Sequence, residues 1–242
     1  MSTIPAIRPK LTNFVLSIDT AGPACQAVVS DGFRIISEQS VTMLRGHGEA
    51  LIPMVEQVLA DASITYDELD RIGVTVGPGS FTGMRVGLAA ARGFSATLNI
   101  PVVGIGSLEA LARSDRLDSG AEAVRCVAMD ARNGLVYGQR FNADGGALEP
   151  AAVMADLVFA ASVTNGVRLV GPATTIIAAL VRSTGKRITL GSTVQVPSTA
   201  ALAELSAAGD VTQVPKPLYL KPADAIASKP AGLRLGLDAG AV

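Results

Sequence analysis

The sequence predicts an α/β fold made of two similar halves, and three observations point to it. Each half opens on a β-rich run that ends in an aspartate-led turn and leads into a returning strand, within residues 14–30 and again within 124–141. Each half later contains a strand that ends in Gly-Pro, at residues 77–78 and 171–172. Strand-like segments alternate with helical ones in both halves, as they do in α/β domains.

The first hairpin is predicted from residues 14–18, which are rich in β-branched and aromatic side chains and end at Asp19. Residues 25–30 predict the returning strand, and Asp31-Gly32 predicts a tight turn after it. The second half repeats this order, as its strand-like runs and turn residues show. They are residues 124–129, the turn led by Asp130, residues 135–141 and the turn at residues 144–146.

Two such halves predict two ribonuclease H-like lobes, arranged as in the actin-like, sugar kinase and Hsp70 (ASKHA) superfamily, with the second lobe trimmed. In that arrangement the aspartate-led turns and the glycine-rich turn face a cleft between the lobes. The polar residues 114–120 predict a connector, which gives an N-terminal lobe over residues 1–113 and a C-terminal lobe over residues 114–242.

Composition excludes several classes of protein. The 242 residues are 49% hydrophobic and only 17% charged, which is typical of a folded domain and not of a disordered chain. The net charge is -1, aromatic residues make up 4%, and there is no Trp. Proteins that bind nucleic acid alone usually carry a basic surface or stacking aromatic rings, so we expect no autonomous RNA or DNA binding.

We expect no membrane span. The longest nearly apolar stretch, residues 151–163, contains Asp156 and is shorter than the ~18–20 residues that a spanning helix needs, so it is predicted as a buried helix. The N-terminal segment carries Arg8 and Lys10 but lacks a long hydrophobic run after them, which argues against a signal peptide and for the cytoplasm.

The two cysteines and the single histidine argue against a zinc site. Cys25 and Cys126 are far apart in the sequence and are predicted to be reduced, partly buried thiols. A serine hydrolase built on Ser80 and His47 is also excluded, because a nucleophile elbow needs glycines where Pro78 and Thr82 stand.

The glycine-rich turn after the strand that ends at Gly77 has the composition of a phosphate site. Glycines let backbone N–H groups approach an anion, and a helix expected to begin near Gly83 adds favourable partial charge. The spacing fits neither the Walker A pattern nor the dinucleotide fingerprint. The residues expected to face a phosphate are Gly77, Gly79, Ser80, Thr82 and Gly83. Glycines that serve packing alone explain the pattern equally well.

Asp19 and Asp130 are paired by the repeat. Such carboxylates could hold Mg²⁺ through water beside a nucleotide. The alternative is that each aspartate caps its own turn, as Asx side chains do.

Two helices carry signals of interaction. Over residues 49–61 the apolar side chains span about 160° at about 100° per residue, wider than one core contact requires. In the helix after Gly83, small residues follow at four-residue spacing and allow close helix packing. The predicted partner-facing residues are Leu51, Ile52, Met54, Val55, Val58 and Leu59 on the first helix and Gly87 and Ala91 on the second. Both helices could equally pack within their own lobe. Arg85 and Arg92 are expected to be solvated.

Six segments of the chain together resemble the TsaB family, also called YeaZ. They are LSIDTAG (16–22), HGEALIPMVEQVL (47–59), VGPGSFTGMRVG (76–87), GIGSLEALA (104–112), DARNGLVY (130–137) and PLYLK (217–221). Residues 142–214 resemble the family only loosely. TsaB is the bacterial accessory subunit for threonylcarbamoyladenosine formation in tRNA.

The resemblance implies the two-lobed actin-like fold and a chain without catalysis of its own. It implies binding to a metal-dependent catalytic paralogue, TsaD, which the chain activates, and assembly with an ATPase, TsaE. Alone, the chain would form a homodimer, and it would meet tRNA only through the complex. The resemblance leaves open a nucleotide, ATP or ADP, at the heterodimer interface. Ser107 and Leu111 stand where the catalytic paralogue carries metal-binding histidines, so no metal is expected.

The family resemblance also favours a partner interface on the two helices. One alternative is an actin-like ATPase or phosphotransferase that uses Asp19, Asp130 and the glycine-rich turn. Another is a self-associating structural protein. Mg-ATP turnover would favour the first alternative, and exclusive homodimerisation would favour the second.

Overall fold

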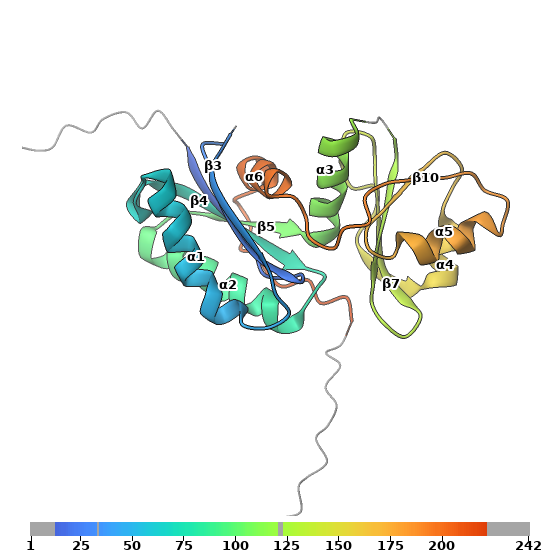
Figure 1. Cartoon of the computed structure of the whole chain (residues 1–242), viewed down its shortest axis with the longest axis horizontal. Coiled ribbons are helices and arrows are strands. Elements are labelled where there is room, and N and C mark those ends of the chain that lie inside the picture. Colours follow the sequence, from blue (N-terminus) through green and yellow to red (C-terminus); the bar gives the residue numbers. More distant parts are fainter. Residues whose placement is uncertain (1–12, 33, 121–122, 222–242) are drawn as a thin grey trace, which may run out of the picture.

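The computed structural model describes residues 13–32, 34–120 and 123–221, and these form two five-stranded sheets (Figure 1). The first sheet has the order β3-β2-β1-β4-β5. Its strands are β1 (Phe14–Asp19), β2 (Ala24–Ser30), β3 (Ile35–Thr42), β4 (Leu69–Gly77) and β5 (Val102–Gly106). Strand β1 pairs antiparallel with β2 and parallel with β4, so the predicted first hairpin is confirmed.

The second sheet has the order β10-β9-β6-β7-β8, which is the first order repeated on the next set of strands. Its strands are β6 (Arg125–Asp130), β7 (Leu135–Phe141), β8 (Ala152–Ala155), β9 (Arg168–Val170) and β10 (Thr189–Leu190). Strand β6 pairs antiparallel with β7 and parallel with β9, as β1 does with β2 and β4. The repeat and the two-lobed α/β fold are therefore confirmed, with shorter strands at both edges of the second sheet.

Helices cover both sheets and fill the space between them (Figure 1). The helices are α1 (His47–Ala62), the 3₁₀ turn η1 (Tyr66–Glu68), α2 (Phe81–Leu98), α3 (Ser107–Ser119), α4 (Asp156–Ser162), α5 (Thr174–Arg182) and α6 (Thr199–Ala208). Helices α1 and α2 pack on the outer face of the first sheet, and α4 and α5 pack on the second. Helices α3 and α6 lie between the sheets and contact each other.

Helix α6, the last helix in the described ranges, returns to the first sheet, where it packs on β1 and β4. Its Ser206 hydroxyl lies 2.7 Å from the Ser17 hydroxyl on β1. A Cβ at Gly73 on β4 would lie 1.8 Å from the Ser206 Oγ, so this glycine allows the close approach. Helix α6 follows residue 113 in the sequence, yet it packs on the first sheet. The lobe boundary at residue 113 therefore stays a prediction.

Residues 114–120, which were expected to form a polar connector between the lobes, are helical. They are the last turns of α3 and its C-cap, Gly120. Asp115 is buried and accepts hydrogen bonds from Arg125 Nε at 3.0 Å and Arg168 Nε at 2.7 Å. Part of the polarity of this segment comes from Asp115, which belongs to a buried ion pair. Sequence polarity alone does not distinguish such a residue from one in a solvated linker.

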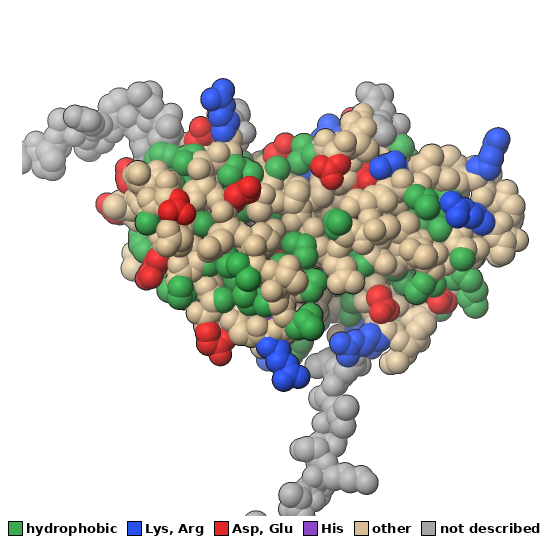
Figure 2. All heavy atoms as spheres, in the orientation of Figure 1, with side chains coloured by type: hydrophobic (Ala, Val, Ile, Leu, Met, Phe, Trp, Pro, Cys, Tyr) green, Lys and Arg blue, Asp and Glu red, His purple; other side chains and the backbone are tan. Residues whose placement is uncertain are grey.

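The stretch 151–163 is likewise not one buried helix. Ala152–Ala155 forms β8, which pairs with β7, and only Asp156–Ser162 is helical. Leu157 and Val158 on α4 are exposed. No helix in the described ranges is long and apolar enough to cross a membrane, and Arg8 and Lys10 lie outside the described residues. On the face in Figure 2, basic and acidic side chains are scattered and do not gather into one charged surface.

Candidate functional site

The two aspartates of the repeat occupy equivalent turns. Asp19 ends β1, and its Oδ1 accepts the Ala21 N–H at 2.8 Å. Asp130 ends β6, and its Oδ1 accepts the Arg132 N–H at 2.7 Å. Each carboxylate thus caps its own turn, in agreement with the second of the two interpretations offered for the pair. Within the described ranges, no group of three or more His, Cys, Asp or Glu could hold a metal ion.

Asp19 differs from Asp130 in its surroundings. Its side chain is buried, whereas Asp130 is exposed. Burial raises the pKa of the Asp19 carboxyl, because the charged form loses its hydration, although hydrogen bonds from Thr75 and Ala21 oppose this effect. The Thr75 hydroxyl donates to Asp19 Oδ1 at 2.6 Å. Asp19 therefore joins β1 to β4 at the base of the glycine-rich turn.

Two glycines of that turn, Gly79 and Gly83, fit closely against residues 20 and 21. Gly77 has a φ of 109°, which favours glycine. A Cβ on Gly79 would lie 2.4 Å from the Ala21 carbonyl oxygen, and one on Gly83 would lie 2.0 Å from that of Thr20. The Ser80 N–H donates to the Ala21 oxygen at 2.8 Å. These glycines therefore serve packing, and neither Gly77 nor Gly79 lines the pocket described next.

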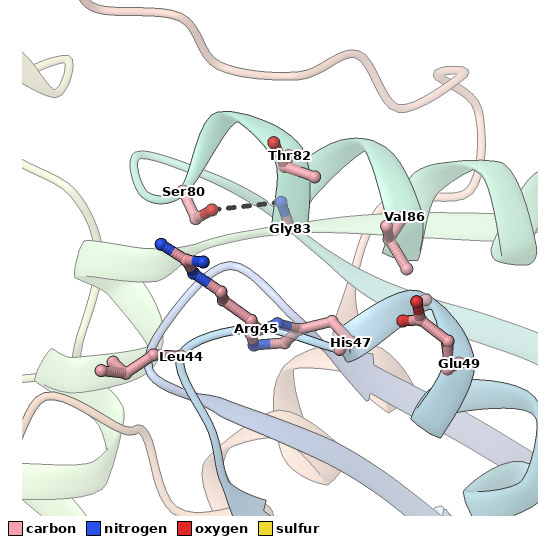
Figure 3. Close-up of a pocket in the computed structure, with 10 residues that line it drawn as sticks. Leu44, Arg45, His47, Glu49, Ser80, Thr82, Gly83 and Val86 are labelled. Carbon is pink, nitrogen blue, oxygen red and sulfur yellow. Dashed lines mark hydrogen bonds between the residues drawn. The ribbon is translucent and has the colours of Figure 1, made fainter.

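A pocket of about 660 Å³ lies between the starts of α1 and α2 (Figure 3). Its lining residues are Leu44, Arg45, Gly46, His47, Gly48, Glu49, Ser80, Thr82, Gly83 and Val86. Three of the residues predicted to face a phosphate, Ser80, Thr82 and Gly83, line it. Asp19 and Asp130 do not, so the structure does not gather the predicted set into one site.

The two helices begin differently at this pocket. Ser80 caps α2, because its Oγ accepts the Gly83 N–H at 3.2 Å, and the helix begins at Phe81, slightly before the expected start. Helix α1 follows Gly46, which has a φ of 86° and offers no side-chain cap. The first N–H groups of α1 therefore lack the side-chain acceptor that α2 has.

Arg45 was not among the predicted site residues, and His47 was considered as a serine hydrolase partner and rejected. His47 is 8% exposed, and its Nε2 has no hydrogen-bond partner among the residues that the structure describes. Arg45 is exposed, and its guanidinium points toward Ser80 (Figure 3). The run Arg45-Gly46-His47 at a helix start is the sequence signal that indicates these pocket residues.

The predicted partner-facing residues of α1 and α2 are mostly core. Ile52 is 40% exposed and is available to a partner. The buried ones are Leu51, Met54, Val55, Val58, Leu59, Gly87 and Ala91. The prediction is therefore corrected for these residues, because the wide apolar arc of α1 is filled by the sheet and by α2 of the same chain.

The PLYLK segment crosses the end of β4 and the side of α2. The Leu218 N–H donates to the Val76 oxygen at 2.7 Å. Arg92 Nη2 donates to the Pro215 oxygen at 2.7 Å, and Arg85 Nε donates to the Tyr219 hydroxyl at 3.0 Å. Arg85 and Arg92 are exposed, as expected, and in addition they hydrogen-bond residues 215 and 219 and hold this part of the chain against α2.

Ser107 and Leu111 lie on α3 between the two sheets. Leu111 is buried in a cluster with Val127 and Phe141 and offers no metal ligand. Cys25 and Cys126 are buried, free thiols, as predicted, and burial raises the pKa of each to about 11.

Comparison with known proteins places these features in context. Residues 36–229 match the family model of TsaD, tRNA N6-adenosine threonylcarbamoyltransferase. The Escherichia coli tRNA threonylcarbamoyladenosine biosynthesis protein TsaB is 32% identical over 131 residues, which are 54% of this chain and 55% of that protein. An uncharacterized Mycobacterium tuberculosis protein is 40% identical over 129 residues, 52% of this chain and 58% of that protein.

A solved structure of YeaZ from Pseudomonas aeruginosa has the same fold, with a TM-score of 0.72. It is 23% identical, and the match covers 86% of this chain and 100% of that one. In contrast, the chain spans little more than half the length of the curated relatives it matches.

Proposed function

Because the chain belongs to the tRNA N6-adenosine threonylcarbamoyltransferase family, and within it to the TsaB (YeaZ) proteins, we propose that it takes part in forming threonylcarbamoyladenosine in tRNA. The family match over residues 36–229 is the observation that carries this proposal. We further propose that the chain is a noncatalytic subunit, which binds and activates the catalytic relative TsaD in the cytoplasm.

The noncatalytic role is supported by two residues of α3, Ser107 and Leu111. Leu111 is 2% exposed and packs in the core, and Ser107 replaces the other expected histidine. A leucine side chain cannot ligate a metal, and a serine hydroxyl is a poor substitute for imidazole. The single histidine of the chain, His47, is on α1.

The partner surface we propose is the outer side of α1 and α2, which contact each other on the first lobe. Ile52, Pro53 and Glu56 are exposed on α1, and Ala89 and Gly93 are exposed on α2. A Cβ on Gly93 would meet no atom within 4 Å, so the backbone there is open to close approach. Helices of a partner can pack closely where no side chain projects from the helix surface.

The remaining assembly follows the same proposal. The ATPase TsaE joins the complex, and tRNA is held chiefly by the other subunits, since this chain carries a net charge of -1. The chain forms a homodimer when alone. Any ATP or ADP in the complex would bind at the heterodimer interface.

The test of the partner surface is heterodimer formation with purified TsaD, followed by sedimentation velocity at micromolar concentrations. Ile52→Glu is expected to abolish the heterodimer, because it places a charge on the partner surface. Leu157→Glu is the matched control, since Leu157 is 65% exposed on α4 of the other lobe. Retention of the heterodimer by Ile52→Glu would contradict this assignment of the surface.

An ATPase or phosphotransferase remains the rival activity. Calorimetric titration of the isolated chain with Mg-ATP, together with a phosphate-release assay, distinguishes the two. We expect no turnover, because Asp19 is buried in its turn and Gly79 and Gly83 pack against residues 20 and 21. Turnover that is lost in Asp19→Asn would contradict the noncatalytic proposal.

A further inference from the structure

Helices α4 and α5 present an exposed apolar face on the second lobe. They contact each other on the outer side of the second sheet (Figure 1). The exposed residues of the face are Leu157, Val158 and Ala161 on α4 and Ile176 and Ala179 on α5. The three large side chains, Leu157, Val158 and Ile176, are 65%, 58% and 58% exposed. Single exposed apolar side chains are ordinary, whereas a group of them on two adjacent helices marks an interaction surface.

The two helices run in the same direction. At the start of α4 the Asp156 N–H donates to the Gly134 oxygen, in the turn between β6 and β7, at 3.0 Å. At the start of α5 the Ala173 N–H donates to a backbone oxygen of β6 at 3.1 Å. Beyond the end of α5, Lys186 Nζ donates to the Ala161 oxygen near the end of α4 at 2.7 Å. Both helices therefore start at the edge of the sheet where β6 ends.

The two ends of this face carry opposite charges. Asp156 lies at the start of α4, where its Oδ1 accepts the Leu157 N–H at 2.6 Å. Arg182 ends α5, and Lys186 and Arg187 follow it, so the other end is basic. Arg182 is exposed and makes no ion pair within the described ranges. Apart from Asp156 and Arg182, neither helix carries a charged side chain.

We propose that a second copy of this chain covers the face, with the two copies related by a two-fold axis and their helices antiparallel. A two-fold interface must be complementary to itself. The antiparallel arrangement places Asp156 of each copy opposite the basic end of the other, with the apolar residues between them. A parallel arrangement would instead bring the two basic ends together, which is unfavourable. The proposal names the surface of the homodimer proposed above, on which it rests, and it leaves the outer side of α1 and α2 to TsaD.

Sedimentation velocity of the isolated full chain, over a concentration series up to about 1 mM, tests the surface. The unmodified chain is expected to dimerise reversibly. Ile176→Glu is expected to raise the dissociation constant of the homodimer about tenfold or more, because it places a charge from each copy in the apolar interface. Val194→Glu is the matched control, since Val194 is 50% exposed and lies outside both helices. An unmodified chain that stays monomeric, or an unchanged constant in Ile176→Glu, would overturn the proposal.

Charge reversal tests the antiparallel arrangement. Arg182→Glu and Asp156→Arg are each expected to raise the dissociation constant about threefold or more, because like charges then face each other across the interface. The double variant is expected to return to within about twofold of the unmodified chain, because opposite charges face each other again. Thermal unfolding checks that each variant folds. Weaker dimers in both single variants without recovery in the double variant would overturn the arrangement.

Other occupants of the face give different results. A homodimer formed through α1 and α2 would be lost in Ile52→Glu and kept in Ile176→Glu, and this result would overturn the proposal. If TsaD covered α4 and α5, Ile176→Glu would abolish the heterodimer, whereas we expect this variant to bind TsaD as Val194→Glu does. Each of these results separates a failure of this surface from a failure of the proposed role with TsaD, because homodimer and heterodimer are measured separately.

Discussion

At the scale of single residues, Asp19 and Asp130 show how one local rule is used twice. Each ends the central strand of a sheet, and each accepts the N–H two residues later. The sequence pattern predicts both turns, because an aspartate after a β-rich run favours an Asx turn. It does not predict that Asp19 is buried and Asp130 exposed, since burial depends on long-range packing that differs between the two turns.

The burial of Asp19 predicts a pH dependence. Its folded pKa is raised above the ordinary value of 3.8, so its contribution to stability is fully present below that pH and is lost as the pH rises through the folded pKa. Asp19→Asn keeps an oxygen acceptor for Thr75 and Ala21 without the buried charge. We expect the melting temperature of Asp19→Asn minus that of the unmodified chain to increase from pH 4 to pH 7. A difference that decreases over this range would contradict the assignment.

The glycine-rich turn gives a second prediction at the residue scale. Gly83→Ala should lower the free energy of unfolding by about 1–3 kcal/mol, because its Cβ would collide with the Thr20 backbone, which has little freedom to move. Gly93→Ala on the same helix meets nothing within 4 Å and should raise it by about 0.5–1 kcal/mol. Urea unfolding measures both. Equal effects would show that the turn does not require a glycine at position 83.

At the scale of elements, α1 shows the limit of hydrophobic periodicity. The pattern predicts the helix to within a residue or two of its ends, because apolar spacing is a local property. The width of its apolar arc was interpreted as a partner surface. That interpretation failed for Val55 and its neighbours because both the sheet and α2 pack against the helix, and a single sequence does not reveal how many elements of its own chain cover a face.

The burial of α1 predicts that substitution by Glu changes the free energy of unfolding by different amounts at two positions of this helix. Val55 is 0% exposed, so Val55→Glu should lower the free energy of unfolding by on the order of 3–5 kcal/mol, as an unpaired buried charge does. Ile52 is 40% exposed, so Ile52→Glu should change it by only about 0.5 kcal/mol. Denaturant unfolding of the isolated chain measures both. A stable, folded Val55→Glu variant would contradict the placement of this face in the core.

At the scale of the whole molecule, the two sheets repeat one topology, and helices α3 and α6 lie between them. The repeat could be predicted, because hairpin and Gly-Pro signals recur in order along the chain. The positions of α3 and α6 could not, because they depend on long-range contacts such as those of Asp115 with the second sheet and Ser206 with the first. The pocket escaped prediction for the same reason, since its two helix starts are distant in sequence.

The Asp115 cluster predicts how strongly α3 is tied to the second sheet. Asp115 and Arg125 each have a side chain only 1% exposed, so Asp115→Ala should lower the free energy of unfolding by about 3–5 kcal/mol. Glu204 pairs with Arg113 at 2.9 Å but is 45% exposed, so Glu204→Ala should cost less than about 1 kcal/mol. Chemical denaturation compares the two variants. Similar losses would show that burial does not distinguish these ion pairs.

The most direct measurement of the central claim is reconstituted tRNA modification. TsaD, TsaE, ATP, the threonylcarbamoyl precursors and unmodified tRNA are combined with and without this chain, and threonylcarbamoyladenosine is quantified in the digested tRNA. The account predicts that modification requires the chain and that the chain alone, without TsaD, forms none. Modification at the same rate without the chain, or modification by the chain in the absence of TsaD, would contradict it.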